Sequence, residues 1–288
     1  MDGQAREGSR DGNRENQSLR IGCVKYLNAR PLIRGWTGRV MFDHPAVLCA
    51  QLARNELDLA LVSSFEFLRN PIYRIVDHVS ICSAGPVYSV FVAHRGSISE
   101  IEEIELDPAS ETSVNLLRYL LAESKLAPRL VTRSTSSGVG ARVLTRGKDL
   151  RLGTAASTAR RAFLLIGDQA IRFRQEYGGE FHFWDLGEQW ARVVDLPFVY
   201  ALWLVRPEVI DARTIGDCLR ALRDENLASL DRLVAEEKEF DRDFCLRYYR
   251  EHLRFDLGEK EKEGLREFQR LCQKHGLLPK GEIEFNVV

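Results

Sequence analysis

A short apolar run that is followed by an asparagine is the first candidate for a ligand-binding segment in this sequence. Residues 21–32 read IGCVKYLNARPL, so Asn28 closes the run and Pro31 stops it from continuing as a paired strand. A carboxamide at the mouth of a buried strand offers one acceptor and two donors where a crevice opens. The plain alternative is a strand followed by an asparagine turn, and further polar clusters at strand ends favour the binding interpretation.

Four more segments place small polar residues beside the ends of apolar runs. They are Ser63 with Ser64, the stretch 83–89, the stretch 107–113, and 166–168. In open α/β folds, ligands bind outside the carboxyl ends of strands. The five segments together therefore predict one shared pocket.

The best anion-binding candidate is Ser110-Glu111-Thr112-Ser113. Ser110 is a good N-cap for a helix predicted over residues 114–122. Free N–H groups and the helix dipole favour a carboxylate or phosphate at that end, and the hydroxyls of Thr112 and Ser113 add donors. A plain helix cap is the structural alternative.

Two other segments have equally simple alternatives. Gly85 with Pro86 fixes a turn before a strand that carries Ser89, which could also lie on a polar strand face. Asp168 could orient a ligand hydroxyl, or it could cap a helix that begins at Gln169.

Three basic residues lie near the first of these segments. Lys25, Arg30 and Arg34 could neutralise an anion, although such charges are more often solvated at the surface.

Other catalytic signatures are missing from the sequence. The six cysteines form no CxxC pair and the six histidines show no HExxH or HxH pattern, so no metal site is expected. Gly138 and Gly140 lack the GxGxxG frame and a Walker lysine. There is no nucleophile elbow, no Ser-His-Asp order and no evident base. No cofactor is expected.

The bulk composition is that of a globular protein large enough for two lobes. The chain has 288 residues, of which 44% are apolar and 29% charged, with a formal net charge of −1. This balance gives no reason to expect nucleic acid or a membrane as a partner, and the cysteine usage suits a reducing cytoplasm. Residues 1–18 lack the apolar core of a secretory signal and are predicted to form a disordered tail.

Alternating strand and helix signals place the chain in the α/β class, with central mixed sheets and a helical C-terminal region. Strands are predicted over 19–26, 57–62, 72–80, 87–94, 130–132, 150–153, 162–167, 181–186 and 198–205, with a glycine-containing loop over 136–140. Helices are predicted over 46–54, 114–122, 214–223, 229–237, 241–253 and 260–275. Trp190 and Trp203 are expected to be packing anchors.

With these segments assembled, the chain resembles the chorismate dehydratases of the futalosine route to menaquinone. The residues that carry the resemblance are Ile21-Gly22, Tyr26-Leu27-Asn28, Pro31-Leu32, 55–63, Gly85-Pro86-Val87, Ser89-Val90, Asp107, Ser110, Thr112-Ser113, Ile166-Gly167-Asp168, Asp185-Leu186-Gly187, Trp190, 196–199 and Trp203. They span about residues 19–205, and the ordered set is more specific than any one motif. One departure is Val194-Asp195, where the family usually has Thr-Gly. Asp195 restricts the backbone, and it would repel an anionic substrate if it faced the ligand.

The resemblance implies a two-lobed type II periplasmic-binding-protein-like fold that closes over a small-molecule ligand. Lobe one would hold 19–97 and 205–288, and lobe two 98–204. The implied reaction, in the cytoplasm, is the loss of water from chorismate to give 3-(1-carboxyvinyloxy)benzoate. Asn28 and Ser89 would flank the reacting edge, and Thr112 and Ser113 would grip a carboxylate. The remaining implied substrate-binding residues are Ser63, Ser83, Gly85, Ser110 and Asp168. The enolpyruvyl carboxylate of the substrate could be the base.

Three other functions share these features. One is a non-catalytic cytosolic protein of the same fold that binds a small carboxylate. Another is the sister enzyme that makes dihydroxynaphthoate from a futalosine-derived substrate. The segment Tyr26-Leu27-Asn28 argues against this second function. The third is a degenerate homologue with a regulatory or scaffold role.

Overall fold

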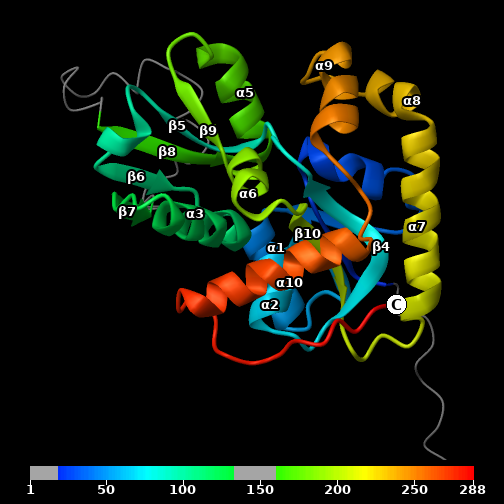
Figure 1. Ribbon diagram of the computed structural model, residues 1–288. Helices are drawn as coiled ribbons and strands as arrows, with labels where there is room; N and C mark the ends of the chain where they lie inside the picture. Colours follow the sequence, from blue (N-terminus) through cyan, green and yellow to red (C-terminus); the bar gives the residue numbers. More distant parts are fainter. Residues whose placement is uncertain (1–18, 133–159) are drawn as a thin grey trace, which may run out of the picture.

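The computed structural model describes residues 19–132 and 160–288, and these fold around two five-stranded mixed sheets (Figure 1). The tail predicted over 1–18, the loop over 136–140 and the strand over 150–153 lie outside the described residues. The α/β class expected from the alternating pattern is confirmed.

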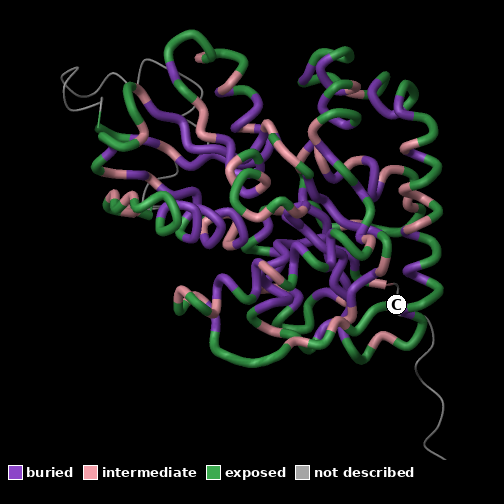
Figure 2. The backbone as a smooth tube through the Cα atoms, viewed as in Figure 1, coloured by how far each residue is buried: buried purple, intermediate pink, exposed green. Residues whose placement is uncertain are grey.

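The first sheet has the strand order β2-β1-β3-β10-β4. The strands are β1 (Ile21–Val24), β2 (Val40–Asp43), β3 (Leu59–Ser63), β4 (Arg74–Ser83) and β10 (Phe198–Val205). β1 runs parallel to β2 and β3, whereas β10 lies antiparallel between β3 and β4. Every residue of β1, β3 and β10 is buried (Figure 2), as expected for strands that are covered on both faces.

The second sheet repeats this arrangement with the order β7-β6-β8-β5-β9. Its strands are β5 (Val90–His94), β6 (Glu103–Leu106), β7 (Arg129–Thr132), β8 (Arg161–Ile166) and β9 (His182–Asp185). β6 runs parallel to β7 and β8, and β5 lies antiparallel between β8 and β9. In each sheet one antiparallel strand therefore enters from the other half of the molecule.

The chain crosses between the sheets earlier than the sequence predicts. The expected boundaries near residues 97 and 205 would put β5 in the first lobe and β10 in the second. Strand pairing instead puts β5 in the second sheet and β10 in the first. The polar stretch 96–105 follows β5, and Pro207 follows β10. Both features therefore come after the chain has already passed from one sheet to the other.

The helices pack against the faces of the sheets and connect their strands. They are η1 (Leu27–Leu32), α1 (Pro45–Ala53), α2 (Ser64–Arg69), η2 (Ile98–Glu100), α3 (Glu111–Glu123), α5 (Gly167–Tyr177), α6 (Leu186–Val194), α7 (Ala212–Ala228), α8 (Leu230–Ala235), α9 (Arg242–Arg247), the π-helical turn η4 (Tyr248–His252) and α10 (Glu259–Lys274). Figure 1 shows α3, α5 and α6 on the side of the second sheet and α7 to α9 on the opposite side. Among the described residues, no helix combines the length and apolar character needed to cross a bilayer.

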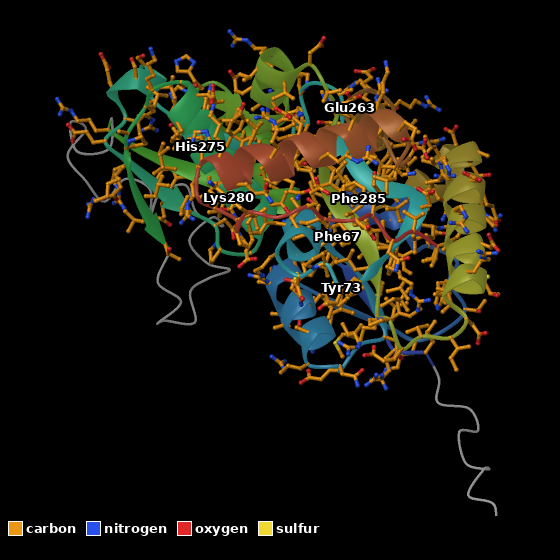
Figure 3. All side chains as sticks on the ribbon, turned by 60° about the horizontal axis from the view of Figure 1, so that its bottom comes forward. Phe67, Tyr73, Glu263, His275, Lys280 and Phe285 are labelled. Atoms are coloured by element: carbon orange, nitrogen blue, oxygen red, sulfur yellow. The ribbon has the colours of Figure 1, made fainter. Side chains whose placement is uncertain are left out.

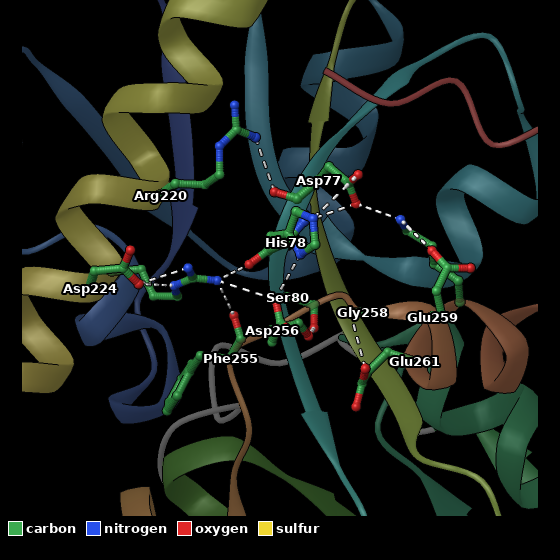
Figure 4. Close-up of polar contacts among 12 residues, drawn as sticks. Asp77, His78, Ser80, Arg220, Asp224, Phe255, Asp256, Gly258, Glu259 and Glu261 are labelled. Carbon is green, nitrogen blue, oxygen red and sulfur yellow. Dashed lines mark hydrogen bonds and ion pairs between the residues drawn. The ribbon is translucent and has the colours of Figure 1, made fainter.

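The C-terminal helical region is fastened to the edge strand β4 by polar contacts (Figure 4). The Lys262 ammonium on α10 lies 2.8 Å from the Asp77 carboxylate of β4, and Arg220 on α7 donates to the Asp77 carbonyl at 3.1 Å. At the end of the chain, the Phe285 ring packs edge-on against Phe67 of α2, with centroids 5.5 Å apart (Figure 3). These contacts fasten the C-terminal part of the chain to the first sheet and to α2.

Candidate functional site

A pocket lies between the two sheets, where the ends of strands from both sheets meet. Its empty volume is about 510 Å³ when the opening to solvent is included. It is lined by Val24, Tyr26, Asn28, Pro45, Ser63, Ile81, Val87, Val90, Ser110, Ser113, Ile166, Gly167, Tyr200 and Ala201. The carboxyl ends of β1, β3 and β8 therefore open into one space, as the sequence analysis predicts.

The pocket divides the candidate residues into two groups. Asn28, Ser63, Ser110 and Ser113 line it directly. The residues that lie outside the lining and contact it through neighbours are Ser83, Gly85, Ser89, Thr112 and Asp168.

Asn28 is carried by the short 3-10 helix η1, which is held from both sides. The Asp168 carboxylate, from α5, accepts the N–H of Leu27 at 2.8 Å. The Tyr249 hydroxyl, from η4, donates to the Leu27 carbonyl at 2.9 Å. The Oδ1 atom of Asn28 is buried and has no hydrogen-bond partner within 19–132 and 160–288. Buried polar atoms normally have partners, so a ligand donor in the pocket would complete this one.

Asp168 does not cap its own helix. α5 begins at Gly167, and its N-cap residue Ile166 makes no side-chain cap, so the predicted cap for a helix starting at Gln169 is wrong. Burial raises the pKa of the Asp168 carboxyl, and the hydrogen bond from Leu27 opposes that rise. The physical reason is that the carboxylate turns across the interface between the sheets to meet η1.

Thr112 connects the second sheet to the first. Its hydroxyl accepts the N–H of Phe65 at 2.9 Å and lies 3.2 Å from the hydroxyl of Ser64. It also contacts the hydroxyl of Ser63, which in turn accepts the N–H of Thr112 at 3.1 Å. The Thr112 side chain is therefore occupied within the protein, where it fixes Ser63 at the pocket wall.

The N-terminus of α3 faces the pocket with two serines. The Ser110 side chain accepts the N–H of Ser113 at 3.3 Å and the Ser113 hydroxyl at 3.2 Å. Ser110 is therefore the N-cap of α3, which was one of its two predicted roles. Both serines also line the pocket. The one acidic residue of the first turn, Glu111, is paired with Arg69 at 2.7 Å. The dipole end of this 13-residue helix is a favourable place for an anion.

The turn that leads to Ser89 is fixed by the buried carboxylate of Asp185. This carboxylate accepts the N–H groups of Val87 at 3.0 Å and of Tyr88 at 2.8 Å. Burial raises its pKa, and these hydrogen bonds oppose the rise. Tyr88 has a φ of 68°, which is rare for a residue with a side chain and is held here by the surrounding contacts.

Ser83 and Gly85 support the pocket through Tyr200. The Ser83 hydroxyl donates to the Gly85 carbonyl at 3.0 Å and lies 3.2 Å from the Tyr200 hydroxyl. Tyr200 itself lines the pocket. A Cβ atom added at Gly187 would lie 2.5 Å from the Gly85 carbonyl oxygen and 2.6 Å from the Tyr200 hydroxyl, so this corner requires glycine.

Four tyrosines belong to the site and were missed by the sequence analysis. Tyr26 and Tyr200 line the pocket, and Tyr248 and Tyr249 reach it from the C-terminal helical region. The Tyr248 hydroxyl donates to Ser89 Oγ at 2.7 Å. The adjacent tyrosines in the predicted helix 241–253 were the available signal, but that helix lies more than 150 positions after Ser89.

No lysine or arginine of the described residues lines the pocket. Arg30 and Arg34 are paired with Glu237 and Glu236 of the segment after α8, and Lys25 is exposed. No group of three or more histidine, cysteine or acidic side chains within the described ranges could hold a metal ion. An anion here would be held by hydroxyls and by the N-terminus of α3.

The Val194-Asp195 departure lies at the end of α6. Asp195 is exposed, follows the last helical residue and adopts the left-handed conformation with φ 59° and ψ 31°. This is the conformation that glycine adopts most easily after a helix. Asp195 is not among the pocket-lining residues, so its charge does not face the pocket.

Comparisons with known proteins agree with this architecture. The alkanesulfonate-binding protein SsuA from Xanthomonas axonopodis pv. citri superposes with a TM-score of 0.64 at 15% identity, covering 94% of this chain and 97% of that one. A Candida albicans protein described as having the generic periplasmic binding protein fold superposes with a TM-score of 0.59 at 12% identity, covering 94% and 96%. At these identities the likeness establishes the fold alone, which confirms the expected periplasmic-binding-protein-like architecture.

Sequence relatives identify the family. A chorismate dehydratase from Thermus thermophilus is 30% identical over 256 residues, covering 86% of this chain and 93% of the relative. A family model described as menaquinone biosynthesis matches residues 19–274, which includes every lining residue of the pocket. The chain therefore belongs to this menaquinone-biosynthesis family.

Proposed function

We propose that this protein is a chorismate dehydratase, a hydro-lyase that removes water from chorismate to give 3-(1-carboxyvinyloxy)benzoate. The observation that carries the proposal is the identity of 30% to a chorismate dehydratase over 86% of the chain. A pocket between the two sheets, lined by hydroxyls and one carboxamide, supports it.

In this reaction the main tasks of the protein are to orient the substrate and to place hydrogen-bond donors where negative charge develops. A proton leaves C3 and hydroxide leaves C4, so one water is lost and the ring becomes aromatic. Aromatisation supplies the driving force, and the enzyme must hold the ring and stabilise the charge that develops as the proton leaves. The enolpyruvyl carboxylate of the substrate is the proposed base, since the pocket lining contains no Asp, Glu, His or Lys among the described residues.

The roles of the lining residues follow from their hydrogen-bonding capacity. Ser110, Ser113 and the first N–H groups of α3 would bind one carboxylate of the substrate. Asn28 cannot act as a base, so its free Oδ1 would accept a hydrogen bond from the ligand. Ser89, which adjoins the lining residue Val90, would direct its hydroxyl toward the reacting edge. Ser63 would contact the ligand beside them.

The remaining candidates would act through these residues. Thr112 would hold Ser63, and Asp168 would hold the helix that carries Asn28. Ser83 and Gly85 would hold Tyr200. We further propose two lobes built on the two sheets, closure over the ligand, and a role in the cytoplasm in the futalosine route.

Incubation of purified protein with chorismate, followed by liquid chromatography and mass spectrometry, tests the function. An aromatic product lighter by one water, absent without protein, is the expected result. The competing function is a small-carboxylate-binding protein, and the alkanesulfonate-binding protein of similar fold, solved with MOPS bound, motivates it. Chorismate that raises the thermal midpoint of the protein but stays intact would favour that alternative.

A further inference from the structure

Tyr248 is a buried residue of the C-terminal helical region whose hydroxyl reaches the site from outside both sheets. It opens the turn η4, and only 1% of its surface is exposed. Its ring stacks on Phe244, with centroids 5.7 Å apart and planes inclined by 12°. Its hydroxyl donates to Ser89 Oγ at 2.7 Å, so packing and a hydrogen bond both fix its position.

The hydrogen bond from Tyr248 decides what the Ser89 hydroxyl can do. The backbone of Ser89 is already engaged, because its N–H donates to Val87 at 2.8 Å and its carbonyl accepts the N–H of Gly167 at 2.9 Å. A serine hydroxyl carries one proton and two lone pairs. Since Tyr248 fills one acceptor position, the proton of Ser89 remains for another acceptor. Val87 and Val90, on either side of Ser89, line the pocket.

Asn28 is a second polar neighbour of Tyr248. Burial raises the pKa of Tyr248, and its polar contacts with the side chains of Ser89 and Asn28 oppose that rise. The Oδ1 atom of Asn28 is buried without a partner in the described part of the chain. Tyr248 therefore lies beside both residues that the proposed function places at the reacting edge.

The backbone of η4 allows two neighbouring tyrosines to donate hydrogen bonds to the same side of the pocket. Tyr248 reaches Ser89, and Tyr249 donates to the Leu27 carbonyl beside Asn28. Neighbouring residues of an α-helix point about 100° apart, and the wider π-helical turn changes that spacing. Such turns occur often at functional sites.

We propose that Tyr248 is a positioning residue for the dehydration: by occupying one acceptor position of the Ser89 hydroxyl, it directs the Ser89 proton toward the substrate. This inference rests on the proposed function. Without the Tyr248 hydroxyl, Ser89 is free to turn its proton away from the ligand. Loss of such orientation lowers the rate of the chemical step more than it lowers binding.

Steady-state kinetics with chorismate test the proposal on wild type, Tyr248→Phe, Ser89→Ala and the double variant. Tyr248→Phe keeps the ring on Phe244, so the fold is retained and the thermal midpoint checks this. We expect kcat to fall about tenfold while KM changes by less than about twofold. The matched control is Tyr73→Phe, a fully buried tyrosine outside the pocket whose hydroxyl lies 3.5 Å from Asn70 (labelled in Figure 3). It should keep the wild-type kcat.

The double variant separates positioning from general packing. If Tyr248 acts through Ser89, the double variant is no slower than Ser89→Ala alone. Multiplied losses in the double variant, or a full rate in Tyr248→Phe while the wild type is active, would overturn this inference and leave the proposed function intact. A wild-type protein that neither converts nor binds chorismate would overturn both.

Discussion

The carboxylate of Asp168 accepts the backbone N–H of Leu27 across the interface between the two sheets, at a distance of 2.8 Å. The residue after Leu27 is Asn28, so a side chain of the second half fixes the position of a pocket-lining side chain of the first half. Tyr249 holds the carbonyl of the same residue. The pocket geometry is therefore a property of the assembled halves and of the C-terminal helical region together.

Two replacements of Asp168 distinguish the contribution of its hydrogen bond to Leu27 from the contribution of its charge. Asp168→Asn keeps an oxygen for the Leu27 N–H and removes a charge whose burial is costly, so stability at pH 7 should not fall. Asp168→Ala leaves the buried N–H without a partner and should cost about 1–3 kcal/mol. Urea unfolding at pH 7 measures both. Equal destabilisation by both variants would show that the N–H is not the important contact.

The same pair gives a pH dependence with a definite sign. Since the pKa of Asp168 is raised in the folded protein, the unfolded chain ionises first as the pH rises above the ordinary aspartate range. The protein therefore loses stability relative to Asp168→Asn as pH rises through the raised pKa, and the difference is constant above it. Urea unfolding of both proteins between about pH 4 and 7 measures this. A wild type that gains stability over Asp168→Asn with rising pH would contradict the sign.

The part of this site that could be predicted from sequence is the part built from local signals. Asn28 follows an apolar run, and Ser110 precedes a helix, so both were found from neighbouring residues. The partners that hold them come from distant segments: Asp168 is 141 positions from Leu27, and Tyr248 is 159 positions from Ser89. Local patterns carry no information on such pairs. For the same reason the sheet to which β5 and β10 belong could not be predicted, because strand pairing is set by tertiary contacts.

Removal of the Asn28 side chain should lower activity without lowering stability. Its Oδ1 atom lacks a partner within the described ranges, so Asn28→Ala removes a desolvated polar atom from the ligand-free protein. We expect a thermal midpoint no lower than that of the wild type and a fall in kcat of about 10²-fold with chorismate. Ser89→Ala should also slow turnover, but it removes the acceptor of the Tyr248 hydroxyl and should lower the midpoint. Unchanged turnover in both variants would remove these residues from the mechanism.

Asp195→Gly should stabilise the protein and leave its kinetics unchanged. The residue adopts φ 59° at the end of α6, where glycine has no steric penalty, so we expect a gain of about 0.5–1 kcal/mol. Asp195→Asn removes the charge but keeps the side chain, which makes it the matched control. If the charge at this position acted on an anionic substrate, both variants would lower KM. We expect KM for chorismate to stay the same in both.

Gly167→Ala should damage the pocket itself. Gly167 has φ 61°, and an added Cβ atom would lie 2.9 Å from the Tyr26 ring, so the substitution strains the backbone and pushes a second lining residue. We expect a loss of about 1–3 kcal/mol in the free energy of unfolding. Turnover should fall with it, because Tyr26 and the start of α5 both move relative to Asn28. The control is Gly179→Ala, where an added Cβ atom meets nothing within 4 Å and stability should change by less than about 0.5 kcal/mol. Equal stability and activity of the two variants would show that the contact between Gly167 and Tyr26 does not shape the pocket.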